Sequence, residues 1–445
     1  MKITEMAHQT ASLKFMAGKK VVFDASDPGT GKTYVEIMDF ARQHKKDKKA
    51  ALVVCPKSLM HAAWANDIKK FAPHLRVSLC YAKNRAAALN ADADVFIVNV
   101  DGVKDLLKQG KKFYAKFGRL IIDESTAFKH HTSQRSKAMA KLSQHFEYRR
   151  CMSGTPSSNG ICDLWHQYYI LDGGKRLGPS YFGFRAACCT PTQNGPSAQH
   201  IKWTDKPGIE IMVAELVKDI TIRHKFEDCV DIPENHKYAL SIQLTPSHMA
   251  MYNELQEDSL AVMRETTITA INAASLATKL LQTASGAVYN DEGGYSLVGT
   301  ERYELALDLV EERAHSIVFY QWDHQLQELT KGAHARKLKF AVWNPDHPEV
   351  ADEFQAGQYQ VLFAHPQSAG HGLTLTKGTA TIWASPTYNL EHYLQGLKRV
   401  HRIGQKDKTE TIVIVAEGTI DEKVWTALQA KNVKMTNLLT ELEAA

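Results

Sequence analysis

The sequence lacks the marks of a secreted, disulfide-rich or membrane-embedded protein. Its 445 residues include only seven cysteines, all between Cys55 and Cys229, and no pair has CxxC spacing. This distribution favours reduced thiols over a disulfide framework or a zinc site. No apolar run approaches the roughly 20 residues of a membrane-spanning helix. The N-terminal stretch MKITEMAHQT also has no signal-peptide core. We therefore expect a soluble intracellular protein with no membrane partner.

Neither sign of charge is in large excess. Charged residues make up 23% and hydrophobic residues 44% of the chain, and the formal net charge is +5. This balance is typical of a folded globular protein rather than a disordered one. It permits a polyanionic partner without requiring one. The length fits about two to three domains of ordinary size.

Short and almost continuously apolar runs recur in both halves of the chain. They begin at Val21, Ala51, Val77, Asp94, Arg119 and Arg149, and again at Ser316, Leu338, Tyr359, Thr379 and Thr411. Helical patterns separate them, so we interpret the runs as strands buried on both faces of parallel sheets. The sequence therefore predicts an α/β protein with two doubly wound lobes, residues 1–230 and 231–445.

The region between the two sets of strands has a different composition. Residues 172–208 are rich in glycine and proline and are expected to be irregular. Thr245 and Pro246 then fit the N-cap and first residue of a helical segment. This segment ends at about Tyr289 and is followed by NDEGGYS, which indicates a turn or short hairpin. We predict a helical insertion between the two sheets, at about 245–290, and count it with the second lobe.

A candidate phosphate loop follows the first strand. The strand at Val21 runs into SDPGTGKT, residues 26–33, and a helical pattern comes next. Glycines in such a loop let backbone N–H groups surround phosphates at a helix N-terminus. Lys32 would neutralise the β and γ phosphates, and Thr33 would ligate Mg²⁺. Ser26 departs from the glycine or alanine of the strict pattern, but the strand, loop and helix in succession favour a nucleotide site.

An acidic pair, Asp123 and Glu124, ends the strand that begins at Arg119. By itself such a pair often caps the next helix. Together with a phosphate loop it indicates phosphoryl chemistry, in which Asp123 anchors Mg²⁺ and Glu124 positions or deprotonates the attacking water.

A basic stretch, QGLKRVHRIGQ, occupies residues 395–405. Its charge is compatible with a solvated helix face or a patch for nucleic acid. Arg399 and Arg402 are three residues apart and would share one face of a helix, as two guanidiniums that reach for one polyanion must. The charge pattern alone leaves both interpretations open.

These stretches, with others around them, resemble the motifs of the superfamily II helicases and more narrowly those of the SWI/SNF-type DNA translocases. The first half contributes AHQTASLKFM, VVCPKSLMHAAWANDIKKF, VNVDG, DESTAFKHHTSQRSKAMAKL and MSGTPSSNGICDLWHQ. The second half contributes IVFYQWDHQLQEL, SAGHGLTLT, QGLKRVHRIGQ and EGTIDEKV. The motifs follow the family's order over most of the chain, and the Arg-Ile-Gly-Gln ending of the basic stretch is typical of the SWI/SNF type.

The resemblance implies two RecA-like lobes with ATP and Mg²⁺ in a cleft between them. In this arrangement Arg399 and Arg402 act as arginine fingers and join Lys32, Asp123 and Glu124 in catalysis. Thr33 and Asp123 are the implied metal ligands. The implied ATP-binding residues are Gln9, which would read adenine, and Asp27, Pro28, Gly29, Thr30, Gly31, Lys32, Thr33, Gly370, Gly372 and Gln395.

The resemblance also implies a nucleic-acid partner, with double-stranded DNA favoured. Backbone contacts are expected because loop hydroxyls, amides and ammonium groups suit phosphates without reading bases. The residues implied are Lys57, Ser58, Lys129, Ser153, Gly154, Thr155, Ser368 and Ala369. For Trp64 and Trp165 we expect packing rather than base stacking.

Thr126 departs from the family's pattern, because the acidic box usually has histidine at this position. The change puts in question how hydrolysis is coupled to the Gly-Thr-Pro box, Gly154 to Pro156. The short chain without appended domains resembles motor-only members from phages and bacteria. The expected location is therefore the cytoplasm of a bacterium or of a phage-infected host cell.

Other functions stay open at this level. A strand-separating DNA or RNA helicase would use the same motor, and an ATP-gated clamp without sustained turnover would be compatible with Thr126. A kinase or transporter ATPase would use only the phosphate loop and would leave the second lobe and its arginines without a role. Repair, fork remodelling, recombination and displacement of bound proteins would all employ the same motor.

Overall fold

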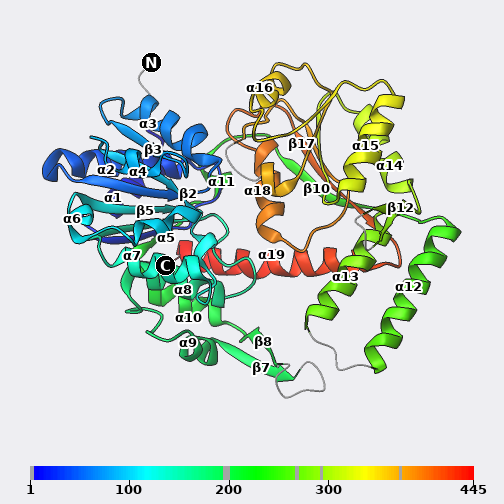
Figure 1. Ribbon diagram of the computed structural model, residues 1–445, viewed down its shortest axis with the longest axis horizontal. Helices are drawn as coiled ribbons and strands as arrows, with labels where there is room; N and C mark the ends of the chain where they lie inside the picture. The colour runs from blue at the N-terminus through cyan, green and yellow to red at the C-terminus, as the bar shows by residue number, and fades with distance from the viewer. Residues whose placement is uncertain (1–4, 194–200, 266–269, 291–293, 370–372, 445) are drawn as a thin grey trace. The chain divides into compact units, whose positions relative to one another are not determined.

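The computed structural model describes residues 5–193, 201–265, 270–290, 294–369 and 373–444 (Figure 1). It divides into two compact units, the first made of Met1–Asp231 with Lys431–Ala445 and the second of Ile232–Ala430. The sequence-based boundary after residue 230 lies next to this division. The C-terminal residues 431–445, which we had counted with the second lobe, group with the first unit. None of the described helices is both long enough and apolar enough to cross a bilayer.

The first unit is built on a parallel sheet. Its strands lie in the order β3 (Val77–Cys80), β4 (Val95–Asn99), β2 (Ala50–Cys55), β5 (Phe117–Asp123), β6 (Tyr148–Met152), β1 (Val21–Asp24) and β9 (Thr221–Ile222). Each neighbouring pair is parallel. Every residue of β2 and β5 is buried, as their unbroken apolar runs predicted. The six strands expected in this half are confirmed, and the two-residue β9 is an addition too short to carry a pattern.

Helices connect these strands and pack beside the sheet. They are α1 (Ala7–Met16), α2 (Lys32–Asp47), α3 (Asn66–Phe71), α4 (Arg85–Leu89), α5 (Val103–Leu106), α6 (Lys111–Ala115), α7 (Gln134–Ser143), α8 (Cys162–Asp172), α9 (Tyr181–Cys188), α10 (Ile209–Val217) and α11 (Phe226–Cys229). Short 3₁₀ turns cover Val100–Gly102, Ser125–Phe128 and Lys218–Ile220. A π-helical turn, η1, covers Met60–Ala65.

Helix α2 is fixed to the sheet by a buried ionic cluster. Asp39 accepts from Arg119 Nη1 at 2.7 Å and from Arg150 Nη2 at 3.2 Å. The carboxylate of Glu36, also on α2, lies 3.7 Å from Arg119 Nη1. Burial raises the pKa of Glu36 to about 7, against the opposing charges of Arg150 and Arg119. Because the two arginines lie on β5 and β6, the cluster sets the position of α2 relative to these strands.

The expectation of irregular structure over residues 172–208 is wrong in part. This region contains α9, whose N-cap Ser180 accepts from the Gly183 N–H, and an antiparallel hairpin of β7 (Cys189–Gln193) and β8 (Ile201–Asp205). β7 and β8 are mostly exposed, so they show none of the apolar alternation by which strands are recognised.

The second unit has its own parallel sheet, in the order β10 (Asn235–Ile242), β17 (Thr409–Ala416), β16 (Ala380–Trp383), β13 (Ser316–Phe319), β15 (Val361–Ala364) and β14 (Phe340–Val342). Five of these strands match the predicted runs. β10 was not predicted, because its side chains are mostly exposed on an edge strand. The helices are α14 (Glu301–Glu311), α15 (Asp323–Ala335), α16 (Glu349–Gln355), α17 (Pro366–Ala369), α18 (Leu390–Val400) and the first part of α19 (Ile420–Ala444).

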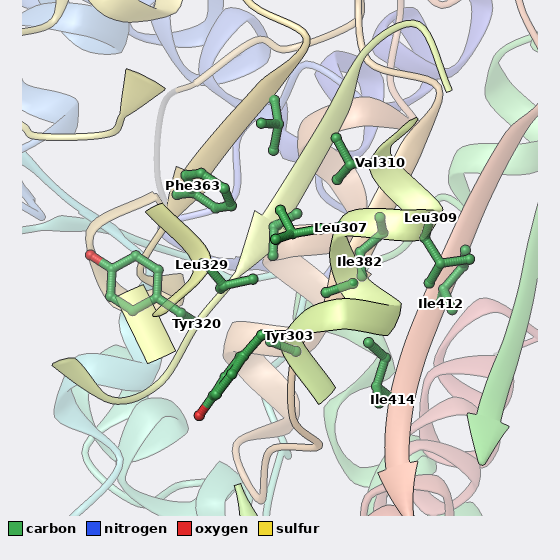
Figure 2. Packing of buried hydrophobic residues seen from close by; sticks show 14 of the residues in the cluster. Tyr303, Leu307, Leu309, Val310, Tyr320, Leu329, Phe363, Ile382, Ile412 and Ile414 are labelled. Carbon is green, nitrogen blue, oxygen red and sulfur yellow. The ribbon is translucent and has the colours of Figure 1, made fainter. Parts of the chain in front are cut away.

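One apolar cluster joins the sheet of the second unit to its helices (Figure 2). Ile382, Ile412 and Ile414 from the strands pack with Leu307 and Leu329 from α14 and α15. All five side chains are buried. Together the two sheets and their helices form the two RecA-like α/β lobes that we expected.

The helical insertion is confirmed as a pair of helices within the second unit. α12 (Pro246–Glu265) begins at the proline assigned to the first helical turn, and α13 (Ala270–Ala284) lies beside it (Figure 1). The hairpin of β11 (Ala287–Tyr289) and β12 (Tyr295–Leu297) follows, where NDEGGYS predicted a turn.

A buried arginine fastens the elements of the second unit to one another. Arg302 on α14 donates to the carbonyls of Ala384 at 2.7 Å, Ile414 at 2.9 Å and Ala284 at 3.1 Å, and it also pairs with Asp421. Arg302 and Asp421 are 2% and 1% exposed. One guanidinium therefore ties α13, β16, β17 and α19 together.

We predict that Arg302→Ala destabilises the second unit by about 3–5 kcal/mol, because it leaves the buried Asp421 carboxylate without its cation. Hydrogen exchange of peptides from β16 and β17 measures this locally, which suits a chain of two units. Arg336→Ala is the control. Arg336 pairs with the exposed Glu304, Asp308 and Glu311, and its loss should cost about 1 kcal/mol or less. Equal protection losses in the two variants would contradict the prediction.

Candidate functional site

In the register of the first sheet, two strands end in an aspartate at the same height along the strand direction. Met152, the last residue of β6, pairs with Asp24 of β1 on one side and with Asp123 of β5 on the other. Carboxyl ends of parallel strands are where α/β proteins bind ligands. The phosphate loop therefore leaves the sheet two strands, or about 10 Å, away from the acidic pair.

The segment predicted to bind phosphate lies between β1 and α2. Gly29 and Gly31 have φ of 92° and 83°, and Gly31 is the N-cap of α2, which begins at Lys32. These left-handed conformations are the reason for glycine at both positions. The Lys32 ammonium donates to the carbonyls of Ser26 at 2.7 Å and Asp27 at 3.1 Å. The loop thus encloses its own lysine at the N-terminus of a helix.

Ser26, which departs from the strict loop pattern, is buried and fully used. Its N–H donates to Asp24 Oδ1 at 2.9 Å, and its hydroxyl accepts from the His224 N–H at 3.0 Å. The hydroxyl therefore ties the loop to the segment that follows β9. A glycine or alanine would lack this connection.

The same segment holds the loop through Asp27, which sequence reasoning treated only as a nucleotide-binding position. Its carboxylate accepts from Arg223 Nη1 at 2.7 Å and from the Phe226 N–H at 3.0 Å. Arg223 also donates to the Ala25 carbonyl at 3.0 Å. A Cβ at Gly29 would lie 3.0 Å from the Phe226 ring, so this contact also requires glycine. Arg223 and Phe226 lie almost 200 residues beyond the loop, and no local motif indicated them.

Gln9 and its neighbour His8 lie against the loop. A Cβ at Gly31 would come within 2.5 Å of Gln9 Nε2. Gln9 Oε1 accepts from the Met6 N–H at 3.0 Å, and a His8 ring nitrogen lies 2.7 Å from the Thr30 carbonyl oxygen. The start of α1 therefore borders the phosphate loop.

Asp123 is an almost completely buried carboxylate, 6% exposed, with two donors of its own. The indole Nε1 of Trp64 donates to Oδ2 at 2.8 Å, and the Glu124 N–H donates to Oδ1 at 3.0 Å. Burial raises the pKa of Asp123 above its ordinary value, and the Trp64 bond, the Lys32 charge and the Glu124 N–H oppose that rise. The influence of Lys32 on Asp123 links the phosphate loop to the acidic pair electrostatically.

Glu124 has an unusual backbone. Its φ of 52° and ψ of 57° lie in the left-handed region, which a non-glycine residue adopts at a cost of about 1–3 kcal/mol. The side chain is half-buried. Strain of this kind collects at functional positions, and here it falls on the residue predicted to position water.

The residues after Glu124 connect the acidic box to the Gly-Thr-Pro box without the histidine that Thr126 replaces. Ser125 Oγ donates to Gln167 Oε1 at 2.7 Å, and Gln167 Nε2 donates to the Pro156 carbonyl at 2.8 Å. All three groups are buried. Thr126 itself is buried as well. A buried chain of hydrogen bonds therefore joins the two boxes through Ser125 and Gln167.

The Gly-Thr-Pro box lies beneath the phosphate loop. The Ser153 N–H donates to the Asp24 carbonyl at 3.1 Å, and a Cβ at Gly154 would collide with the Pro28 ring at 2.4 Å. Ser153 and Thr155 are buried. The contact of Ser153, Gly154 and Thr155 with nucleic acid stays a prediction.

The other predicted nucleic-acid residues differ in exposure. Lys57 and Ser58, directly after β2, are exposed. Lys129 is largely covered, since its ammonium donates to Ser158 Oγ at 2.8 Å and lies 3.3 Å from Asp163. In the second unit Ser368 donates to the His365 carbonyl at 3.0 Å and Ala369 is buried. The contact of Ser368 and Ala369 with nucleic acid stays a prediction. Gly370 and Gly372 lie outside the described residues.

The basic stretch of the second unit brings its two arginines together, but through a different backbone. α18 ends at Val400, so the expectation that Arg399 and Arg402 share one helix face is wrong. Instead, Nη1 of both arginines donates to the Leu373 carbonyl, at 3.2 Å from Arg399 and 2.6 Å from Arg402. Arg399 Nε also donates to the Gln395 carbonyl at 2.9 Å. The guanidiniums therefore converge on Leu373, in the segment between α17 and β16, and Gln395 is buried.

Comparison with known proteins agrees with this arrangement. A family model described as the SNF2-related domain matches residues 8–287, and one described as the helicase conserved C-terminal domain matches residues 301–404. The chain belongs to the SNF2 family. The two matches cover the phosphate loop and acidic pair of the first unit and the arginine stretch of the second. Membership makes this SNF2 chain a helicase-like, ATP-dependent enzyme.

Relatives of the SNF2 chain come from phages and bacteria as well as animals. It is 30% identical over 417 residues to putative protein p41 of Acyrthosiphon pisum secondary endosymbiont phage 1, covering 89% of each chain. It is 24% identical to the putative ATP-dependent helicase/translocase YwqA of Bacillus subtilis, covering 94% of this chain and 47% of the relative. The chain therefore spans under half of that bacterial relative.

A solved structure also resembles the SNF2 chain. The Sulfolobus solfataricus SWI2/SNF2 ATPase core in complex with dsDNA aligns over 100% of this chain and 96% of that one, with 21% identity and a TM-score of 0.47.

We predict that Lys32→Ala lowers ATP turnover by at least about a hundredfold, because a charge that stabilises the transferring phosphoryl group is lost. A steady-state ATPase assay measures this, with circular dichroism to verify the fold. Lys45→Ala, an exposed lysine in the last turn of the same helix, is the control and should retain turnover. Retained turnover in Lys32→Ala would refute the assignment of the phosphate loop.

Proposed function

We propose that the chain is a motor that couples ATP hydrolysis to translocation along double-stranded DNA. The proposal rests on the sheet register, which places the phosphate loop after β1 and the acidic pair after β5 at the same end of one sheet. The same chain also has two arginines whose guanidiniums converge on one carbonyl. A kinase or a transporter ATPase would require the first feature and leave the second without a use.

ATP would bind at the N-terminus of α2. Backbone N–H groups from Gly29 to Thr33 would face the phosphates, and Lys32 would exchange its bonds to the Ser26 and Asp27 carbonyls for phosphate oxygens. The carboxylate of Asp27 is engaged with Arg223, so its contribution would be to hold the loop in shape. Gln9 would contact the adenine from α1.

The side chains at this edge fit a magnesium ion. Thr33 and Asp123 supply oxygen donors, which Mg²⁺ prefers, and few protein ligands suffice when phosphates complete its coordination. Mg²⁺ bound there would neutralise charge on the phosphates during transfer. Glu124 would orient the attacking water, and its left-handed backbone turns the residue away from the regular path of β5.

Arg399 and Arg402 are proposed to contact the γ-phosphate when ATP is bound. Two guanidiniums that already converge on one carbonyl could meet one phosphate with little further ordering. Gln395 is proposed to contribute to the same site.

Nucleic acid is the proposed partner, with Lys57 and Ser58 as the exposed contacts of the first unit. Hydroxyl and ammonium groups bind the phosphate backbone without reading sequence, as a translocating protein requires. One relative is named as a helicase/translocase, which supports motion along nucleic acid as the output. The buried link through Ser125 and Gln167 favours sustained turnover over an ATP-gated clamp, because it gives the acidic box a route to its neighbouring motif.

Duplex translocation and strand separation are distinguished by two assays run side by side. We expect ATP-dependent displacement of a third strand from a triplex, without unwinding of a forked duplex. Unwinding of the fork would favour the strand-separating alternative. Stimulation of ATP turnover by RNA but not by DNA would contradict the proposal that the motor moves along DNA.

We predict that Arg402→Ala lowers turnover by about a hundredfold or more while ATP affinity changes by less than about threefold, since a finger acts mainly in the transition state. Turnover and nucleotide titration separate the two quantities. Lys398→Ala, from the same basic stretch, is the control. An equal loss of DNA affinity in both variants, with a reduced salt slope, would instead favour a simple basic patch for DNA.

A further inference from the structure

The exposed residues Lys57 and Ser58 are joined to Asp123 by a short and continuous piece of chain. The turn Pro56–Leu59 is closed by the Leu59 N–H, which donates to the Pro56 carbonyl at 3.0 Å. The Met60 N–H then donates to the Lys57 carbonyl at 3.3 Å. The π-helical turn η1 (Met60–Ala65) starts at this point and carries Trp64. The exposed turn is therefore hydrogen-bonded to the element that reaches Asp123.

Trp64 does more than fill the core. Its ring is 1% exposed and belongs to the apolar cluster of the first unit, as expected for packing. Yet its only polar atom, Nε1, is aimed at Asp123 Oδ2 at 2.8 Å. A buried indole N–H needs an acceptor, and here the acceptor is the carboxylate of the acidic pair rather than a backbone carbonyl.

The π-helical turn is short and contains Trp64. Single π turns are rare, insert an extra residue into a helix and collect at functional sites. The chain returns to α-helix immediately after Ala65, in α3 (Asn66–Phe71). The irregular turn is thus confined to the residues that include Trp64 and join the exposed turn to α3.

The two oxygens of Asp123 have separate donors. Oδ1 accepts from the Glu124 N–H at 3.0 Å, so one donor comes from the following residue and the other from Trp64, 59 residues away. The rotation of the carboxylate about its χ2 bond is fixed by both. Any displacement of Trp64 would change the direction in which the carboxylate presents its lone pairs to a metal ion.

We infer that Trp64 is the positioning residue through which contacts of nucleic acid with Lys57 and Ser58 set the orientation of the Asp123 carboxylate. The nucleic-acid half of this inference rests on the proposed function, and its metal half rests on the proposed Mg²⁺ site together with the Trp64–Asp123 contact. A nucleic-acid phosphate at Lys57 and Ser58 shifts or stiffens the turn. The turn moves η1, and the indole carries the displacement to Oδ2.

The test replaces Trp64 with phenylalanine, which keeps an aromatic ring in the core and removes the N–H. Trp165→Phe is the matched control, because Trp165 is also buried and donates Nε1 to a backbone carbonyl, that of Gly178 at 3.0 Å. Calorimetric titration of Mg²⁺ with ADP gives a readout independent of turnover. We expect Trp64→Phe to weaken Mg²⁺-dependent nucleotide binding by about tenfold or more and Trp165→Phe to leave it unchanged.

Asp123→Asn completes a double-mutant cycle. If the indole acts through Asp123, Trp64→Phe adds little further loss of Mg²⁺ affinity in the Asp123→Asn background. Additive losses, or equal losses in Trp64→Phe and Trp165→Phe, would overturn the inference and leave Trp64 as a core residue. Thermal unfolding of each variant identifies any that is not folded, and Trp64→Leu, which also lacks a side-chain donor, then replaces Trp64→Phe in the cycle.

The nucleic-acid half of the inference is tested by measuring how far DNA stimulates ATP turnover. Double-stranded DNA should raise the ATP turnover of the unaltered chain several-fold more than that of Trp64→Phe, while both bind DNA equally in an anisotropy titration. Equal stimulation would overturn the coupling. If DNA neither binds nor stimulates the unaltered chain, the proposed function fails, and the Mg²⁺ titration still decides the metal half by itself.

Discussion

The first unit depends on keeping one carboxylate, Asp123, oriented and ionisable in a position that water hardly reaches. A buried charge is costly unless it is hydrogen-bonded and paired. Trp64, the Glu124 N–H and the nearby Lys32 charge supply those partners. Trp64 lies on the π turn η1, Glu124 directly follows strand β5 and Lys32 begins helix α2, so the setting of Asp123 depends on the correct placement of all three elements.

A second network serves the phosphate loop in a similar way. The segment after β9 reaches the loop through Arg223, the His224 N–H and the Phe226 N–H, which meet Asp27 and Ser26. Loops that bind phosphate need their N–H groups aimed in advance, since ordering them at the moment of binding would reduce affinity. The segment Thr221–Cys229 thus orders the loop, although it lies far from it in the sequence.

Much of this could be predicted from sequence because the relevant patterns are local. Buried strands of the type at Ala50–Cys55 show as apolar runs, and Gly31-Lys32-Thr33 between a strand and a helix indicates a phosphate loop. The hairpin β7–β8 and the edge strand β10 escaped because exposed strands carry no apolar pattern. The contacts of Arg223, Gln167 and the Trp64 indole were not predicted, because each joins residues that are far apart in the sequence. The burial of Ser153, Thr155 and Ala369 depends on packing that no motif encodes.

The left-handed backbone at Glu124 has a consequence for how this position tolerates change. Glycine and, to a smaller degree, asparagine adopt that conformation with less strain than glutamate, whereas β-branched side chains adopt it poorly. Selection for a stable fold alone would therefore drift toward glycine here. Glutamate at this position therefore keeps its carboxylate at a cost in fold stability that glycine would avoid.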